Sequence, residues 1–196
     1  MRASDPQAVN LLASIFGDGI KMQSALCEPG TRLTEALAGC RFRRILEIGT
    51  FQGLTAAVLA DYADSVVTLD IQRQPTCEQV WDIFDVQSKI TQIIVKDNAE
   101  KGSVVRGLDF DMAFIDGAHG RQEVAFDFGI VRQKCQHALF HDYPFAVPWG
   151  DSIPMTYCYH EHQWNDTGDG VGFLLDVIQP AGQIERIPPF AWWRAK

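Results

Sequence analysis

Acidic residues recur at or just beyond the ends of five successive apolar runs: Glu47, Asp70, Asp97, Asp116 and Asp142. One acid at such a place is unremarkable, because Asp is common in turns and at helix caps. Five in a row favour a shared ligand site, in which the carboxylates accept hydrogen bonds from ammonium or hydroxyl groups. Imidazoles accompany the later acids at His119 and His141, and these side chains could transfer protons or bind a divalent metal ion.

The loop after the first apolar run is bounded by glycines. Residues 44–48 (Arg-Ile-Leu-Glu-Ile) lead into Gly49-Thr-Phe-Gln-Gly53, and residues 54–62 have the composition of a helix. A strand, a glycine-bounded turn and a helix N-terminus allow a ligand to approach the backbone closely and to meet exposed N–H groups. Glu47 would repel a phosphate and suits an ammonium or hydroxyl group.

The spacing of these residues narrows the class of ligand. The dinucleotide fingerprint G-x-G-x-x-G and the phosphate-binding G-K-[ST] loop are both absent. Asp70 ends the second run, 17 residues after Gly53, where a carboxylate typically binds a ribose diol. The pattern therefore predicts a nucleoside with a cationic or zwitterionic tail and no phosphate, which describes S-adenosylmethionine.

Apolar runs and helical stretches alternate along most of the chain. The strand-like runs cover residues 44–48, 65–70, 91–95, 111–115 and 137–141, with two more expected at 184–187 and 190–193. Helices are expected at 5–16, 31–38 and 121–134, and residues 171–178 fit a helix or a buried strand. This order predicts an α/β, Rossmann-like, doubly wound and mainly parallel seven-stranded sheet with helices on both faces. Residues 1–40 would form a helical extension of a single domain at 41–196.

Composition excludes several classes of partner. The net charge of −8 argues against binding of nucleic acid or of an anionic membrane surface. No run of apolar residues is long enough for a transmembrane helix, and no signal peptide is expected. The five cysteines are scattered and unpaired by spacing, which predicts free thiols and a cytoplasmic location. The aromatic stretch at 143–169 predicts a lid or binding loop.

Several motifs in order resemble one known family. The motifs are Leu46-Glu-Ile-Gly-Thr-Phe-Gln-Gly53, Val67-Thr-Leu-Asp70, Lys96-Asp-Asn98, Phe114-Ile-Asp-Gly-Ala-His119 and Phe140-His-Asp-Tyr143. The chain resembles class I S-adenosylmethionine-dependent methyltransferases. It is most similar to the small O-methyltransferase branch that contains macrocin O-methyltransferases and cephalosporin hydroxylase-type proteins.

The resemblance implies roles for residues of the cofactor site. Gly49, Thr50 and Gly53 would line the methionine part of S-adenosylmethionine, and Glu47 would lie near its ammonium group. The ribose and adenine parts would be bound by Asp70, Ile71, Asp97, Asn98 and Asp116.

The resemblance also implies a catalytic centre. Asp116, His141 and Asp142 match positions that bind a divalent cation, usually Mg²⁺, although His141 replaces the expected first carboxylate of a pair. Without a metal, His119 or His141 could act as the base, and Asp142 would assist at the catalytic centre.

The predicted activity is transfer of a methyl group to a hydroxyl of a small-molecule acceptor. Three alternatives stay open: a metal-dependent hydroxylase-like enzyme, a nicotinamide oxidoreductase, and a non-catalytic S-adenosylmethionine-binding protein. Pairing of the apolar N-terminal helices makes a homodimer a further expectation.

Overall fold

The computed structural model describes residues 1–17, 32–118, 120–141, 174–175, 182–187 and 190–196, and the structural statements below concern these residues. They form seven strands in one sheet. The strands are β1 (Phe42–Ile48), β2 (Ala63–Asp70), β3 (Ile90–Ile94), β4 (Met112–Ile115), β5 (His137–Phe140), β6 (Gly182–Ile187) and β7 (Phe190–Ala195).

The strand order is β3-β2-β1-β4-β5-β7-β6, and neighbours among β1 to β5 pair in parallel. Strand β7 runs antiparallel to both β5 and β6. The mainly parallel, seven-stranded Rossmann-like sheet is therefore confirmed. The chain winds outward in one direction from β1 to β3 and in the other from β4, so the order reverses between β1 and β4. Ligands of such sheets bind beyond the carboxyl ends of the strands at that reversal.

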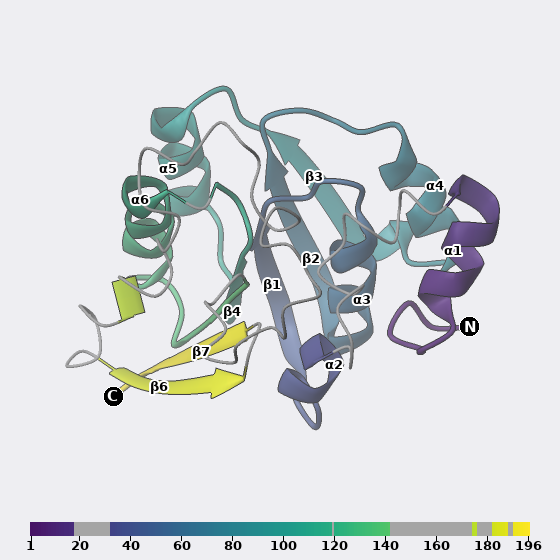
Figure 1. The fold of residues 1–196 in the computed structure, drawn as a ribbon. Coiled ribbons are helices and arrows are strands. Elements are labelled where there is room, and N and C mark those ends of the chain that lie inside the picture. Colours follow the sequence, from purple (N-terminus) through teal and green to yellow (C-terminus); the bar gives the residue numbers. More distant parts are fainter. Residues whose placement is uncertain (18–31, 119, 142–173, 176–181, 188–189) are drawn as a thin grey trace, which may run out of the picture.

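Helices cover both faces of the sheet (Figure 1). The helices are α1 (Ala8–Phe16), α2 (Arg32–Ala36), α3 (Leu54–Tyr62), α4 (Thr76–Ile83), the 3₁₀ turn η2 (Gln87–Lys89), α5 (Asn98–Gly107) and α6 (Arg121–Val131). Buried residues of α1 to α4 share one hydrophobic cluster with the sheet, and those of α5 and α6 share a second on the opposite face. None of the helices in the described part of the chain is both long and apolar enough to cross a membrane.

The alternation of side chains along β1 explains why this strand has a polar residue in its interior. Ile45 packs into the cluster under α3, while Leu46 and Ile48 pack into the cluster under α5 and α6. Successive side chains of a strand point to opposite faces. Glu47 therefore lies on the α3 face with Ile45, and it is fully buried.

Helix boundaries differ from the sequence prediction at three places. The helix predicted at 31–38 ends at Ala36. The predicted helix 5–16 begins only at Ala8, because the Asp5 carboxylate accepts a hydrogen bond from the Arg2 N–H at 2.8 Å and closes a preceding turn. The predicted helix 121–134 ends at Val131, where a turn follows with a hydrogen bond of 2.8 Å from the Lys134 N–H to the Val131 carbonyl. Of the predicted segment 171–178, residues 174–175 are described and are helical.

Candidate cofactor-binding and catalytic site

The loop between β1 and α3 needs glycine at both ends. Gly49 has φ +101°, and a Cβ at this position would lie 2.0 Å from the Asp116 carbonyl oxygen, so the loop crosses directly against the end of β4. Gly53 has φ +84°, and its Cβ would lie 2.8 Å from Trp81 Nε1. The Trp81 indole N–H donates to the Gly53 carbonyl at 2.8 Å and fixes the start of α3. Both predicted glycines are thus required by packing of the loop itself.

Asp70 holds this loop in place through backbone hydrogen bonds. Its Oδ2 accepts from the N–H groups of Thr50 at 3.0 Å and Phe51 at 2.8 Å. Its Oδ1 accepts from the N–H groups of Ile71 at 2.7 Å and Gln72 at 3.3 Å. A carboxylate has about four acceptor positions. A ribose diol at Asp70 would therefore share the carboxylate with the loop, and the predicted ribose role stays a prediction.

Glu47 is a buried acid beneath the same loop. The Thr68 hydroxyl donates to Glu47 Oε2 at 2.5 Å, and the Thr50 and Thr68 hydroxyls are 2.6 Å apart. Burial is the main cause that raises the pKa of Glu47 well above its ordinary value; Asp116 and Asp70 raise it further, against the hydrogen bond from Thr68. None of the described residues gives Glu47 Oε1 a hydrogen bond. This orphaned acceptor fits the ammonium group of a methionine tail, as the sequence predicts.

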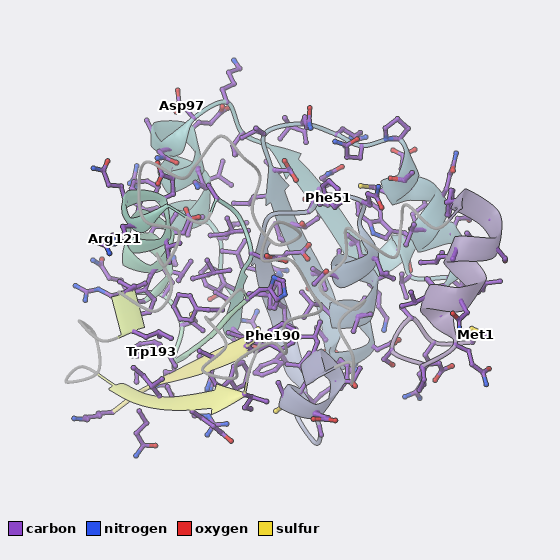
Figure 2. The ribbon with its side chains drawn as sticks, viewed as in Figure 1. Met1, Phe51, Asp97, Arg121, Phe190 and Trp193 are labelled. Atoms are coloured by element: carbon purple, nitrogen blue, oxygen red, sulfur yellow. The ribbon has the colours of Figure 1, made fainter. Side chains whose placement is uncertain are left out.

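Phe51 is a residue of the site that the sequence analysis did not select. It occupies the middle of the Gly49–Gly53 loop with φ +44°, a backbone conformation that favours glycine. Its side chain is 43% exposed, and that of Ile71, on the other side of Asp70, is 74% exposed. Figure 2 shows Phe51 toward the end of the molecule where β1 to β3 end. The signal in the sequence is a bulky residue where the dinucleotide loop has its second glycine.

Asp97 caps helix α5. Its Oδ1 accepts from the Glu100 N–H at 2.8 Å, and the Glu100 side chain accepts from the Lys96 N–H at 2.7 Å. These bonds satisfy N–H groups at the helix start. Asp97 and Asn98 are exposed at the carboxyl end of β3, where Figure 2 shows Asp97. The cap is the structural role of Asp97, and adenine binding by this pair of residues stays a prediction.

Asp116 and His141 form a hydrogen-bonded pair across the ends of β4 and β5. His141 Nδ1 lies 2.9 Å from Asp116 Oδ1, and both side chains are less than one fifth exposed. An ionised carboxylate only accepts, so Nδ1 carries the proton and Nε2 is the basic nitrogen of the neutral ring. The His141 ring packs 5.2 Å from that of Phe190, which fixes its orientation.

The predicted metal site is only partly described. Asp142 and His119 lie outside the described residues, as does the predicted lid at 143–169. Among the residues that are placed, no group of three or more His, Cys, Asp or Glu side chains could hold a metal ion. Asp116 and His141 face each other directly rather than a common ion, so these two alone do not fit a metal site.

The described acids of the site share one face of the sheet. Phe114 of β4 pairs with Glu47 of β1, and its side chain packs in the cluster under α3. Asp116 follows Phe114 by two residues, so its side chain is expected on the same face. His141 is likewise two residues after Leu139, which packs in the same cluster. The structure therefore brings the buried acid, the glycine loop and the Asp116–His141 pair to the carboxyl edge of the sheet at the reversal of strand order.

Comparisons with known proteins agree with this architecture. A family model described as a methyltransferase domain matches residues 46–143. The structure of the Podospora anserina methyltransferase PaMTH1 bound to S-adenosylhomocysteine has a TM-score of 0.64 and 18% identity, over 96% of this chain and 86% of that one. An O-methyltransferase from Bacillus cereus in complex with S-adenosylhomocysteine has a TM-score of 0.67 and 14% identity, over 97% and 90%. A comparison with curated proteins gives no match.

The family match spans half of the chain, from β1 to the end of β5, and includes every described residue of the site. The chain belongs to this family and carries a methyltransferase domain.

Proposed function

We propose that the protein methylates a hydroxyl group of a small-molecule acceptor. The observation that carries this proposal is the Asp116–His141 pair, in which a buried imidazole is held by a carboxylate at 2.9 Å beside the Gly49–Gly53 loop. Methylation of a hydroxyl requires removal of its proton, and an oriented imidazole is suited to that step. The Bacillus cereus protein of similar fold is named an O-methyltransferase, which supports the same acceptor class.

S-adenosylmethionine would lie with its methionine end over Glu47 and its ribose near Asp70. Glu47 Oε1, which lacks a partner among the described residues, would accept a hydrogen bond from the ammonium group. Ionisation of Glu47 accompanies this contact, because a cation nearby favours the charged carboxylate. The exposed Ile71 and Asn98 would contact the nucleoside part.

In the proposed reaction, His141 Nε2 takes the proton from the acceptor hydroxyl while Asp116 stabilises the imidazolium that forms. The acceptor oxygen attacks the methyl carbon, the carbon–sulfur bond breaks, and its electron pair remains on sulfur as neutral S-adenosylhomocysteine. The protein has to hold oxygen and methyl group close and in line, which can lower the barrier by about 7–11 kcal/mol. No step in this scheme requires a metal ion.

A divalent cation remains a separate hypothesis. Asp116 and Asp142 would supply oxygen ligands of the kind that Mg²⁺ prefers, and a bound ion would lower the pKa of the acceptor hydroxyl. In that case the direct hydrogen bond between Asp116 and His141 would have to open. Activity with and without a chelator distinguishes the two routes.

The test uses the wild-type chain, S-adenosylmethionine labelled in its methyl group, and a panel of phenols, catechols and sugars, with Mg²⁺ or with EDTA. We expect label in an alkali-stable methyl ether and no loss of activity in EDTA. A nitrogen- or carbon-methylated product would contradict the acceptor class. Calorimetric binding of S-adenosylhomocysteine without transfer to any acceptor would favour the non-catalytic alternative.

A further inference from the structure

Lys101 and Asp127 form a buried ion pair away from the proposed catalytic residues. Lys101 Nζ of α5 lies 2.5 Å from Asp127 Oδ1 of α6, with side-chain exposures of 14% and 0%. Each of the other Lys or Arg ion pairs between described residues is formed by side chains that are at least one third exposed. Apolar side chains of similar size often stabilise a protein at least as well as a buried ion pair does. Stability alone therefore does not explain the pair.

Asp127 lies against the loop that carries Asp116. A Cβ on Gly117 would be 3.3 Å from Asp127 Oδ2 and 3.3 Å from the Ile48 side chain. The absence of a side chain at Gly117 is what lets the carboxylate approach this backbone. The Asp127 side chain thus lies close to Gly117, the residue after Asp116 in the β4–α6 loop.

Lys101 lies in the first turn of α5, next to the other loop of the predicted nucleoside pocket. Its N–H donates to the Asp97 carbonyl at 2.9 Å, and its ammonium group is 5.5 Å from the Phe126 ring centroid of α6. The pair therefore links the turn that begins at Asp97 to the loop that begins at Asp116.

The sheet connects these two loops only indirectly. Strands β3 and β4 do not pair with each other, because β2 and β1 lie between them. The direct connection is the packing of α5 on α6, where Gly102 approaches the side chains of Phe126 and Ile130. Figure 1 shows these two helices side by side. An ion pair adds a specific distance and orientation to this apolar contact.

We propose that Lys101 and Asp127 are positioning residues that set the separation of the Asp97 and Asp116 loops and so the width of the nucleoside end of the cofactor pocket. The inference rests on the proposed function, because it concerns the same pocket. Neither residue touches the cofactor in this scheme; both act through the loops they support.

The test separates positioning from stability with the double variant Lys101→Met/Asp127→Leu, which replaces the pair by apolar side chains. We expect an unchanged or higher melting temperature and an affinity for S-adenosylhomocysteine that is lower by about tenfold or more. 5′-Methylthioadenosine, which has the nucleoside but no amino-acid tail, should lose affinity by the same factor. Arg41→Gln/Asp64→Asn removes an exposed pair of 57% and 65% exposure and should bind both ligands as the wild type does.

Wild-type affinity in a folded double variant would overturn the inference, and so would a loss confined to S-adenosylhomocysteine. If the double variant does not fold, Asp127→Asn decides in the same way at a temperature where thermal melts show it to be folded, since the unpaired Lys101 should lower its melting temperature. Weaker binding of both ligands by the folded variant supports positioning, and unchanged binding overturns it. Lys101→Arg keeps the charge and should retain most of the wild-type affinity. Failure of the wild-type protein to bind either ligand would instead refute the proposed function.

Discussion

Thr68 donates a hydrogen bond of 2.5 Å to one oxygen of Glu47 and leaves the other oxygen without a partner among the described residues. The two residues are also paired in register between β1 and β2. Glu47 is fully buried beneath the glycine loop, and only one of its two carboxyl oxygens accepts a hydrogen bond from the described residues. Such a group is expensive to ionise in the free protein, and the cation of a bound cofactor would remove that penalty.

Replacement of Glu47 by Gln should stabilise the free protein at neutral pH and should weaken its binding of the cofactor. The raised pKa means that the folded state binds a proton that the unfolded state releases, so stability is highest below the ordinary pKa of 4.5 and falls as the pH rises through the raised value. Glu47→Gln removes this fall and should therefore be more stable than the wild type at pH 8. Denaturant melts at pH 5 and pH 8 measure this difference in stability, with Glu35→Gln at an exposed position of α2 as the control.

The same variant should bind S-adenosylhomocysteine less tightly, because a neutral amide cannot pair with the ammonium group as a carboxylate does. Titration calorimetry in buffers of different ionisation enthalpy should show proton release on binding to the wild type and none with Glu47→Gln. Equal proton release by both proteins would show that Glu47 is not the group that ionises.

Asp70 is expected to act on the loop as well as on the ligand. In Asp70→Asn, an NH₂ group faces two of the four backbone N–H donors in either orientation of the amide. We expect a loss of about 1–3 kcal/mol in stability, together with weaker binding of S-adenosylhomocysteine. The control is Asp64→Asn, at an exposed ion pair. Wild-type stability in Asp70→Asn would mean that the four hydrogen bonds contribute little.

Much of this site follows from the sequence because a parallel sheet collects the carboxyl ends of its strands at one edge. Glu47, Asp70 and Asp116 were predicted there from their positions after apolar runs, and the structure brings Glu47 and Asp70 to the glycine loop. The glycines at 49 and 53 were predicted for ligand access, whereas the structure shows that contacts with Asp116 and Trp81 already require them.

Other features depend on tertiary contacts that a linear pattern does not contain. The positive φ of Phe51 arises from a loop held by Asp70, and the pairing of Lys101 with Asp127 arises from the packing of α5 on α6. The shortened start of α1 is a local competition, in which the Asp5 side chain bonds backward to Arg2 instead of capping the helix. Residue spacing and composition alone do not predict the φ of Phe51, the Lys101–Asp127 pair or the residue at which α1 begins.

Gly49→Ala should be strongly destabilising, and Gly129→Ala mildly stabilising. At Gly49 a methyl group would meet the Asp116 carbonyl oxygen at 2.0 Å, in a backbone conformation that alanine rarely adopts. We expect a loss of more than about 2 kcal/mol. Gly129 is in α6 with no atom within 4 Å of the added Cβ, so alanine should gain about 0.5–1 kcal/mol from its higher helix propensity. Thermal melts of both variants measure the contrast.

Replacement of His141 should remove catalysis and leave cofactor binding intact. If His141 is the base, His141→Gln should lower kcat by about 10²–10⁴-fold and abolish the acidic limb of the pH–rate profile. Asp116→Asn should also lower kcat, because its amide oxygen can still accept from His141 Nδ1 but the neutral amide does not stabilise the imidazolium as a carboxylate does. His137→Gln is the matched control, since His137 lies at the opposite end of β5, stacked on Trp192. Activity that survives in His141→Gln but disappears in EDTA would assign proton removal to a metal-bound acceptor instead.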